Sequence, residues 1–264
     1  MLVKQQRSLF FLLLFIAAAA SAQPDGAEIM SNNFSATKVS GFVGEVTLSL
    51  INDRGEQRVR KMSVRSRLRD NGTDSAVLTR FSQPADIRGT GFLQVENSAA
   101  EDDIWVYLPA LGKTRRLSSN NKRDSFFGTD FSYGDILLPA VDKYRHTLLR
   151  RDRIEDSDCF VVESTPLDAR TREDTGYSRK LNWVDAQSFV ERKVEYYDSQ
   201  NALLKTQTTF DVRAAQLDPG RWMPMRRQMT NHQTGHRTLY QFDRFEVSKS
   251  LKDAEFIARR LEDQ

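Results

Sequence analysis

The chain of 264 residues carries 39 lysine and arginine residues against 36 aspartate and glutamate residues, a formal charge of +3. Part of this basic excess belongs to the first 22 residues, which contain Lys4 and Arg7 and no acidic residue. Without them, 37 basic residues face 36 acidic ones. A nearly neutral chain lacks the basic footprint of a general nucleic-acid-binding protein, so we exclude that class.

The first 22 residues have the pattern of a secretory signal. Lys4 and Arg7 precede the apolar run 9–17, which leads to the small residues Ala20-Ser21-Ala22. This order predicts cleavage after Ala22. The run is shorter than the roughly 20 apolar residues that span a bilayer, which makes a retained anchor the less favoured alternative. No cysteine follows as a lipid-attachment site, so we expect residues 23–264 to be a soluble, monomeric periplasmic domain.

After a loosely periodic segment at 24–40 that predicts a helix, the pattern changes to strands. Val46, Leu48 and Leu50 alternate with polar residues before the turn at 52–55. The return strand separates its residues by face, because side chains alternate across a strand. We expect Met62, Val64, Ser66 and Leu68 to point inward, and Lys61, Arg65, Arg67 and Arg69 to point outward.

Further strands follow along the chain, most of them separated by turn residues. We expect them near 76–81, 88–95, 103–108, 144–154, 158–164, 178–184, 189–197, 203–213, 222–230 and 236–247, with a short helix at 253–262. Short turns between so many strands predict a mainly β fold of about 11–12 antiparallel strands in a sheet that curls or closes. No repeat or linker divides residues 23–264, which indicates one domain.

The long gap between the strands at 103–108 and 144–154 contains a ring-rich stretch, residues 126–136. Loops of this length are usually functional or disordered. We expect residues 118–138 to form a mobile lid, with a polar stem at 118–121 and with Gly128 and Gly134 allowing the backbone to turn. The alternative is a static plug, in which the rings simply complete the core.

Motifs of catalysis are absent from the sequence, so we do not expect an enzyme, a cofactor or a metal. His232 and His236 are four residues apart, but Thr234-Gly235 between them favours a hairpin turn over a metal-binding helix. Cys159 lies in an apolar strand and is expected to be a buried, inert thiol.

The segments 104–117 and 126–136 resemble the LolA-like family of outer membrane lipoprotein-sorting proteins, and residues 86–93, 183–185 and 220–224 are similar to the same family. The resemblance implies a curved antiparallel half-barrel closed by helices or loops over an apolar cavity that binds acyl chains. Relatives of this branch often accompany lipid-exporting pumps.

The resemblance therefore implies a periplasmic carrier of lipid or of lipoprotein acyl chains, moving them toward the outer membrane, with an inner-membrane lipid exporter as a partner. The alternative is a structural or sensor domain with a filled core, and an enzyme of envelope lipids or glycans has the least support. The residues expected to bind lipid are Val64, Leu68, Phe92, Trp105, Tyr107, Phe127, Phe131, Tyr133, Leu137, Trp222 and Met223.

Overall fold

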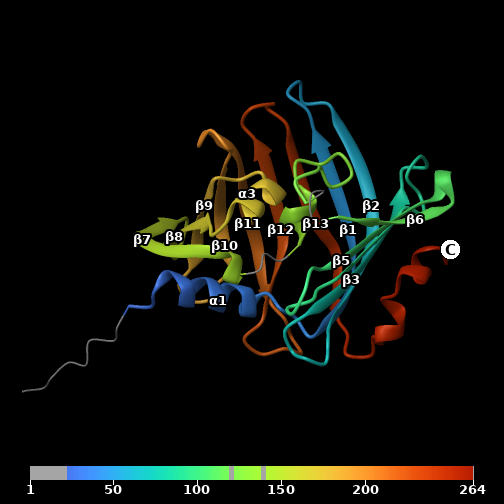
Figure 1. The fold of residues 1–264 in the computed structure, drawn as a ribbon, viewed down its shortest axis with the longest axis horizontal. Coiled ribbons are helices and arrows are strands. Elements are labelled where there is room, and N and C mark those ends of the chain that lie inside the picture. Colours follow the sequence, from blue (N-terminus) through green and yellow to red (C-terminus); the bar gives the residue numbers. More distant parts are fainter. Residues whose placement is uncertain (1–22, 119–121, 138–140, 264) are drawn as a thin grey trace, which may run out of the picture.

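The computed structural model describes residues 23–118, 122–137 and 141–263. The predicted signal peptide lies outside these ranges, as do residues 119–121 and 138 of the predicted lid. The described residues form one antiparallel sheet of 13 strands that curves without closing into a barrel, together with three short α-helices (Figure 1). The predicted half-barrel is confirmed, with more strands than expected.

Two meanders meet in the middle of this sheet. The first runs outward through β1 (Gly41–Ile51), β2 (Gln57–Leu68), β3 (Ser75–Gln83), β4 (Gly91–Val95), β5 (Asp103–Leu108) and β6 (Lys113–Leu117). The second returns inward through β7 (Tyr144–Ile154), β8 (Ser157–Pro166), β9 (Arg179–Asp185), β10 (Glu191–Tyr197), β11 (Leu203–Ala214), β12 (Trp222–Asn231) and β13 (Arg237–Val247). Because β1 pairs with β13, the strands β6 and β7 become the two edges.

The unpredicted strand is β6, whose sequence KTRRL shows no apolar alternation. Its side chains are exposed or half-buried, and it pairs with β5 alone. The short helix α3 (Ala169–Thr175) was also missed; the Asp168 side chain caps it by accepting from the Thr171 N–H. Both elements depend on neighbours or caps more than on a periodic apolar pattern.

The predicted N-terminal helix is α1 (Gly26–Ala36), which lies along β7 and β8 (Figure 1). The Asp25 carboxylate accepts a hydrogen bond from the Glu28 N–H (2.8 Å) and caps the helix. A Cβ on Gly26 would lie 2.7 Å from the His146 carbonyl, so a larger residue would push helix and strand apart. Ile29 and Met30 are buried against the apolar side chains of β8 and β9.

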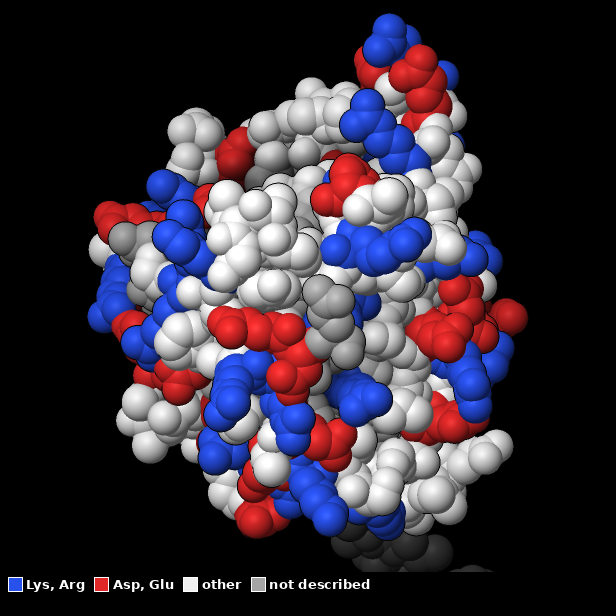
Figure 2. Space-filling model, turned by 90° about the vertical axis from the view of Figure 1, so that its right-hand side faces the viewer, with Lys and Arg blue, Asp and Glu red and all other residues white. Residues whose placement is uncertain are grey.

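The C-terminal segment covers the outer face of β3–β5. Two 3₁₀ turns, η4 (Asp253–Glu255) and η5 (Ala258–Leu261), replace the predicted helix. Phe256 and Leu261 are buried there. Arg65 and Arg67 point outward as predicted and pair with Glu255 and Asp253 of this segment. Part of the basic face of β2 is thus neutralised by acids of the C-terminal segment, and Figure 2 shows both charges interspersed on this side.

Candidate functional site

The ring-rich segment crosses the concave side of the sheet because it connects the two edge strands, β6 and β7. A chain that joins opposite edges of a half-barrel has to pass over its open side (Figure 1). In the described part, residues 122–137, Phe126 and Phe131 are each only 1% exposed. The topology therefore explains why a loop contributes two of the most deeply buried rings.

These rings fill the apolar half of the concave face. The Phe126 ring lies 5.4 Å from Phe92 and 5.0 Å from Phe127, whose ring is 4.8 Å from Phe81. Tyr133 closes the cluster at 5.6 Å from Phe92. Edge-on and tilted contacts at these distances are favourable for aromatic rings. In this conformation the segment is packed as a plug.

A sharp turn at the tip of the segment is held in place by a side chain of β2. Phe127 has a φ of +48° and Gly128 a φ of +74°, both in the left-handed region that non-glycine residues rarely adopt. The Arg60 guanidinium donates a hydrogen bond to the Phe127 carbonyl, and burial lowers the pKa of Arg60. Backbone strain of this kind persists where surrounding contacts hold it in place.

The other end of the segment is held by charge. Helix α2 (Tyr133–Ile136) begins with a capping box between Ser132 and Asp135. The Asp135 carboxylate also accepts from Lys205 Nζ (2.5 Å) and from the Tyr177 hydroxyl (2.9 Å). Burial alone would raise the pKa of Asp135, but Lys205 and the Ser132 N–H hold it below its ordinary value.

Two adjoining hollows lie on the polar half of the concave face. An outer cleft of about 650 Å³ leads to an inner chamber of about 90 Å³, and Phe34, Leu137 and Lys180 line both. The cleft is lined by many charged residues of both signs, including Glu96, Asp102 and Arg170. Both hollows combine charged groups with apolar side chains, among them Met30, Ile136 and Val194 in the inner chamber.

Side chains from four adjacent strands converge on the inner chamber: Lys180 from β9, Glu191 from β10, Gln207 from β11 and Arg227 from β12. Within the described residues, the Lys180 ammonium pairs with no carboxylate and contacts the rings of three tyrosines at 5.1–5.5 Å. The buried Nε of Arg227 has no hydrogen-bond partner among them either. Burial raises the pKa of Glu191, although Lys180 and Arg227 act in the opposite direction.

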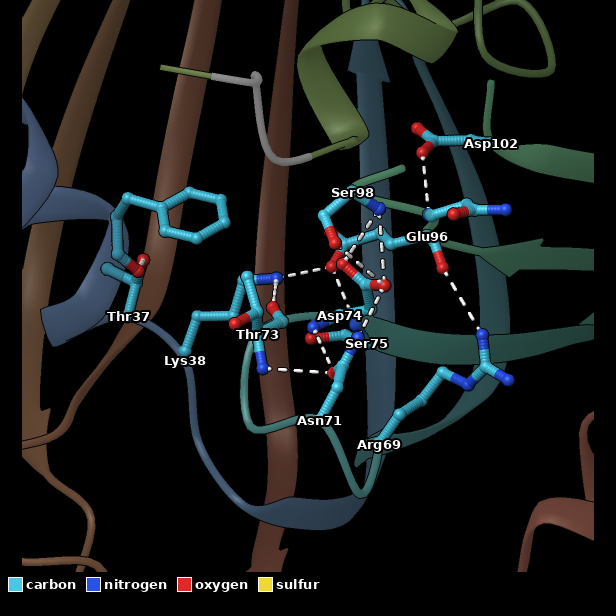
Figure 3. A network of polar contacts seen from close by, with 12 residues as sticks. Thr37, Lys38, Arg69, Asn71, Thr73, Asp74, Ser75, Glu96, Ser98 and Asp102 are labelled. Atoms are coloured by element: carbon cyan, nitrogen blue, oxygen red, sulfur yellow. Dashed lines mark hydrogen bonds and ion pairs between the residues drawn. The ribbon is translucent and has the colours of Figure 1, made fainter. Parts of the chain in front are cut away.

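A second polar network borders the outer cleft and is fully paired (Figure 3). The Lys38 ammonium, 4% exposed, donates to the Glu96 carboxylate and to the Thr73 carbonyl (2.6 Å). Glu96 also accepts from the Ser75 N–H (2.6 Å). These contacts fasten the chain after α1 to the β2–β3 turn and to the end of β4. Because its groups satisfy one another, this network has a structural role.

In the described ranges, no group of three or more histidine, cysteine or acidic residues is placed to hold a metal ion. His232 and His236 are exposed at the β12–β13 turn, as the predicted hairpin required. Cys159 is buried, and burial with the nearby Asp185 raises its pKa to about 11. Among the described helices, none has the length and apolarity needed to cross a membrane.

Comparison with known proteins identifies the family. A family model described as an uncharacterized protein matches residues 73–263. A domain from Vibrio parahaemolyticus, provisionally assigned to outer membrane lipoprotein sorting, is 32% identical with a TM-score of 0.82, covering 90% of this chain and 98% of that one. The chain belongs to the LolA-like family of outer membrane lipoprotein-sorting proteins.

Two further solved structures are similar to this chain. A DUF1329 family protein from Desulfovibrio piger is 27% identical with a TM-score of 0.81, covering 89% of this chain and 97% of that one. A LolA superfamily protein from Nitrosomonas europaea, 22% identical with a TM-score of 0.68 over 89% of this chain and 98% of that one, shares the fold. No curated protein matches the sequence.

The LolA-like sheet divides the predicted binding residues between its two faces. Val64, Phe92, Phe131 and Met223 are buried in the concave core, with Phe127 and Tyr133 packed against it. Leu137, also buried in that core, lines both hollows, and Leu68 is half-buried at the end of β2.

Three predicted residues need correction. Trp105 and Tyr107 pack beneath the C-terminal segment on the outer face, where strand alternation places them opposite the inward-pointing Ile104 and Val106. Trp222 likewise alternates with the inward-pointing Met223. The expectation that these three side chains line the interior is wrong.

The space on the concave face is divided between packed rings and open hollows. Rings of the crossing segment occupy the apolar half of the concave face, and the hollows lie in the polar half. Lys180, Glu191, Gln207 and Arg227 were missed because polar residues at alternate strand positions are normally read as the wet face. A usable signal was the segment RKLNWVD, where Lys180 and Asn182 share a face with Val184.

Proposed function

We propose that residues 23–264, freed of the signal peptide, act as one periplasmic domain that carries lipid or the acyl chains of lipoproteins toward the outer membrane. The observation that carries the proposal is the way in which the apolar half of the concave face is covered. A connecting segment, and not a strand of the sheet, fills this half, so it can leave without breaking a strand pair. The family's assignment to lipoprotein sorting supports the same function.

An acyl chain would replace the rings of the crossing segment. Each buried methylene contributes about 0.8 kcal/mol, so several methylenes are needed to offset the loss of two buried phenylalanines. The strained turn at Phe127 and the single Arg60 contact give the segment a natural point at which to open. Lipid would be received from an inner-membrane exporter, with the carrier as a monomer.

A second candidate is a structural or sensor domain without a ligand. The burial of Phe126 and Phe131 favours it, because a permanently filled core leaves no room for an acyl chain. The two candidates differ in whether the crossing segment ever leaves its place.

The test is a ligand search on the native protein, purified from the envelope without detergent and extracted with organic solvent for mass spectrometry. The carrier proposal expects a bound lipid in near-stoichiometric amount. Because the Arg60 contact holds the ring-filled state, an Arg60→Met variant should take up a fluorescent fatty acid more readily, while Arg58→Met, an exposed arginine on the same strand, should behave like the unaltered protein. Absence of lipid, together with no binding of a fluorescent fatty acid, would favour the structural domain.

A further inference from the structure

The inner chamber contains more positive charge than the protein itself neutralises. Lys205 and Asp135 form their own ion pair (2.5 Å). Of the remaining charged groups that line the chamber, the cations Lys180 and Arg227 face the single carboxylate of Glu191. Burial raises the pKa of this carboxyl, although Lys180 and Arg227 act in the opposite direction. The neighbouring His146 adds no charge near neutral pH, because burial lowers its pKa.

The donors in the chamber are deeply placed and have spare hydrogen-bonding capacity. Lys180 is 9% exposed and Gln207 is 5% exposed. Among the described residues, the buried Arg227 Nε has no hydrogen-bond partner. The Lys180 ammonium contacts tyrosine rings at 5.1–5.5 Å and forms no ion pair with a carboxylate there. Buried polar groups are normally paired, so an unpaired guanidinium nitrogen beside this ammonium indicates a missing acceptor.

The cavity fits a small anion in size and in access. A volume of about 90 Å³ holds several water-sized spheres, since one water needs about 10–15 Å³ by this measure. A phosphate or carboxylate group fits this space, whereas a sugar or a second acyl chain is too large. Lys180 lines both the chamber and the outer cleft, so a ligand entering through the cleft meets this ammonium on its way.

We propose that the inner chamber binds the anionic group, a phosphate or a carboxylate, of an amphiphile, with Lys180 and Arg227 as cationic ligands and the Gln207 amide as a further donor. The inference rests on the proposed carrier function and names its substrate class. The anionic group occupies the polar half of the concave face, and the acyl chain occupies the adjoining apolar half in place of the rings of the crossing segment.

The experiment compares probes that differ in one part. They are palmitoyl lysophosphatidate, monopalmitoylglycerol with the same chain and no phosphate, and inorganic phosphate alone, each titrated by calorimetry into delipidated protein. We expect lysophosphatidate to bind at least tenfold more tightly than monopalmitoylglycerol. Lys180→Gln and Arg227→Gln should each reduce this preference at least fivefold and leave the affinity for monopalmitoylglycerol unchanged.

Matched variants control for folding and charge. Arg226→Gln removes an exposed arginine next to Arg227 on β12 and should leave the preference intact. Lys180→Arg keeps the positive charge and should retain most of the preference. Melting temperatures of all variants are measured without a probe, and a variant that melts far below the unaltered protein is replaced by Gln207→Leu, which should also weaken the preference.

The outcomes separate the two proposals. Equal affinities for lysophosphatidate and monopalmitoylglycerol would overturn the anion site and leave the carrier in place. Binding of phosphate alone, sensitive to Lys180→Gln, with no binding of either lipid would identify a free anion as the ligand and overturn the carrier. Absence of binding by every probe would overturn both.

Discussion

The two halves of the concave face obey the same strand alternation and yet differ in how the space above them is filled. Toward β1–β5 and β13 the inward side chains are apolar, and the rings of residues 126–133 fill the space between them. Toward β9–β12 the charged residues Lys180 and Arg227 lie among apolar ones such as Val194, and the space beside them is hollow. The comparison teaches that an inward position on a curved sheet is not always an apolar one.

The largest effect is expected from removing a ring from the filled half, which tests whether the rings there are tightly packed. Phe131→Ala should lower the free energy of unfolding by about 3–5 kcal/mol, because the ring is buried and a cavity remains. Urea denaturation without a ligand measures this loss. The control is Leu111→Ala, whose side chain is 51% exposed and whose loss should cost little. A small effect of Phe131→Ala would mean that the ring is a loosely packed lid even in the absence of lipid.

The polar half can be tested through its buried ion pair. Asp135→Asn should destabilise the protein by about 3 kcal/mol, because Lys205 then stays buried without a carboxylate. The folded protein holds the pKa of Asp135 below the ordinary 3.8. The stability it provides is therefore present above pH 3.8 and lost as the pH falls through the lower folded value.

Melting temperatures between pH 2 and pH 7 check this dependence. The unaltered protein should lose more stability below pH 4 than Asp135→Asn does. The double variant Asp135→Asn, Lys205→Met removes both charges and should recover part of the lost stability. Parallel acid profiles for the unaltered protein and Asp135→Asn would contradict the assigned pKa direction.

Loosening the turn at Phe127 should reduce stability less than the two preceding changes and should mainly affect how easily the ring-rich segment opens. Arg60→Met removes the donor to the Phe127 carbonyl and should cost about 1 kcal/mol, the value of one hydrogen bond. A fluorescent fatty acid should associate several-fold faster with this variant in stopped-flow measurements, because the segment opens more easily. Unchanged association, with Arg58→Met as the reference, would show that this contact does not hold the segment closed.

Substitutions on the outer face of the sheet should change the stability least. Arg67→Gln loses contacts with Asp253 and Asp70, and such surface pairs contribute about 0–1 kcal/mol. Thermal melts should therefore change by a few degrees at most. Val64→Asp on the same strand should be far more damaging, since it places an unpaired charge in the core. The opposite ranking would reverse the two faces of β2.

The sequence was most informative where burial is one-sided. The faces of β2 could be predicted because Met62 and Val64 alternate with Lys61 and Arg65, and alternation maps directly onto a half-buried strand. The pairing of β1 with β13 could not be predicted, because it joins segments almost 200 residues apart. That pairing decides which strands form the edges, and hence where the ring-rich segment crosses.

The candidate site was predictable only in its apolar part. The aromatic residues between Phe126 and Tyr133 were noticeable because rings are unusual in a loop. Lys180 and Arg227, in contrast, had the pattern of ordinary solvent-facing strand residues. Their burial depends on curvature and on the cover supplied by residues 122–137, which no local pattern encodes. Trp105 and Tyr107 were misplaced because the C-terminal turns give the outer face a small core of its own.

The central claim is that an acyl chain takes the place of the ring-rich segment, and hydrogen exchange tests it most directly. The amides of Phe126 and Tyr133 donate to the carbonyls of Phe131 (2.8 Å) and Asp124 (3.0 Å) and should exchange slowly in the free protein. On saturation with palmitoyl lysophosphatidate, peptides covering 124–133 should exchange much faster, while peptides of β1 and β13 stay protected. Binding of the lipid with unchanged protection at 124–133 would contradict the claim.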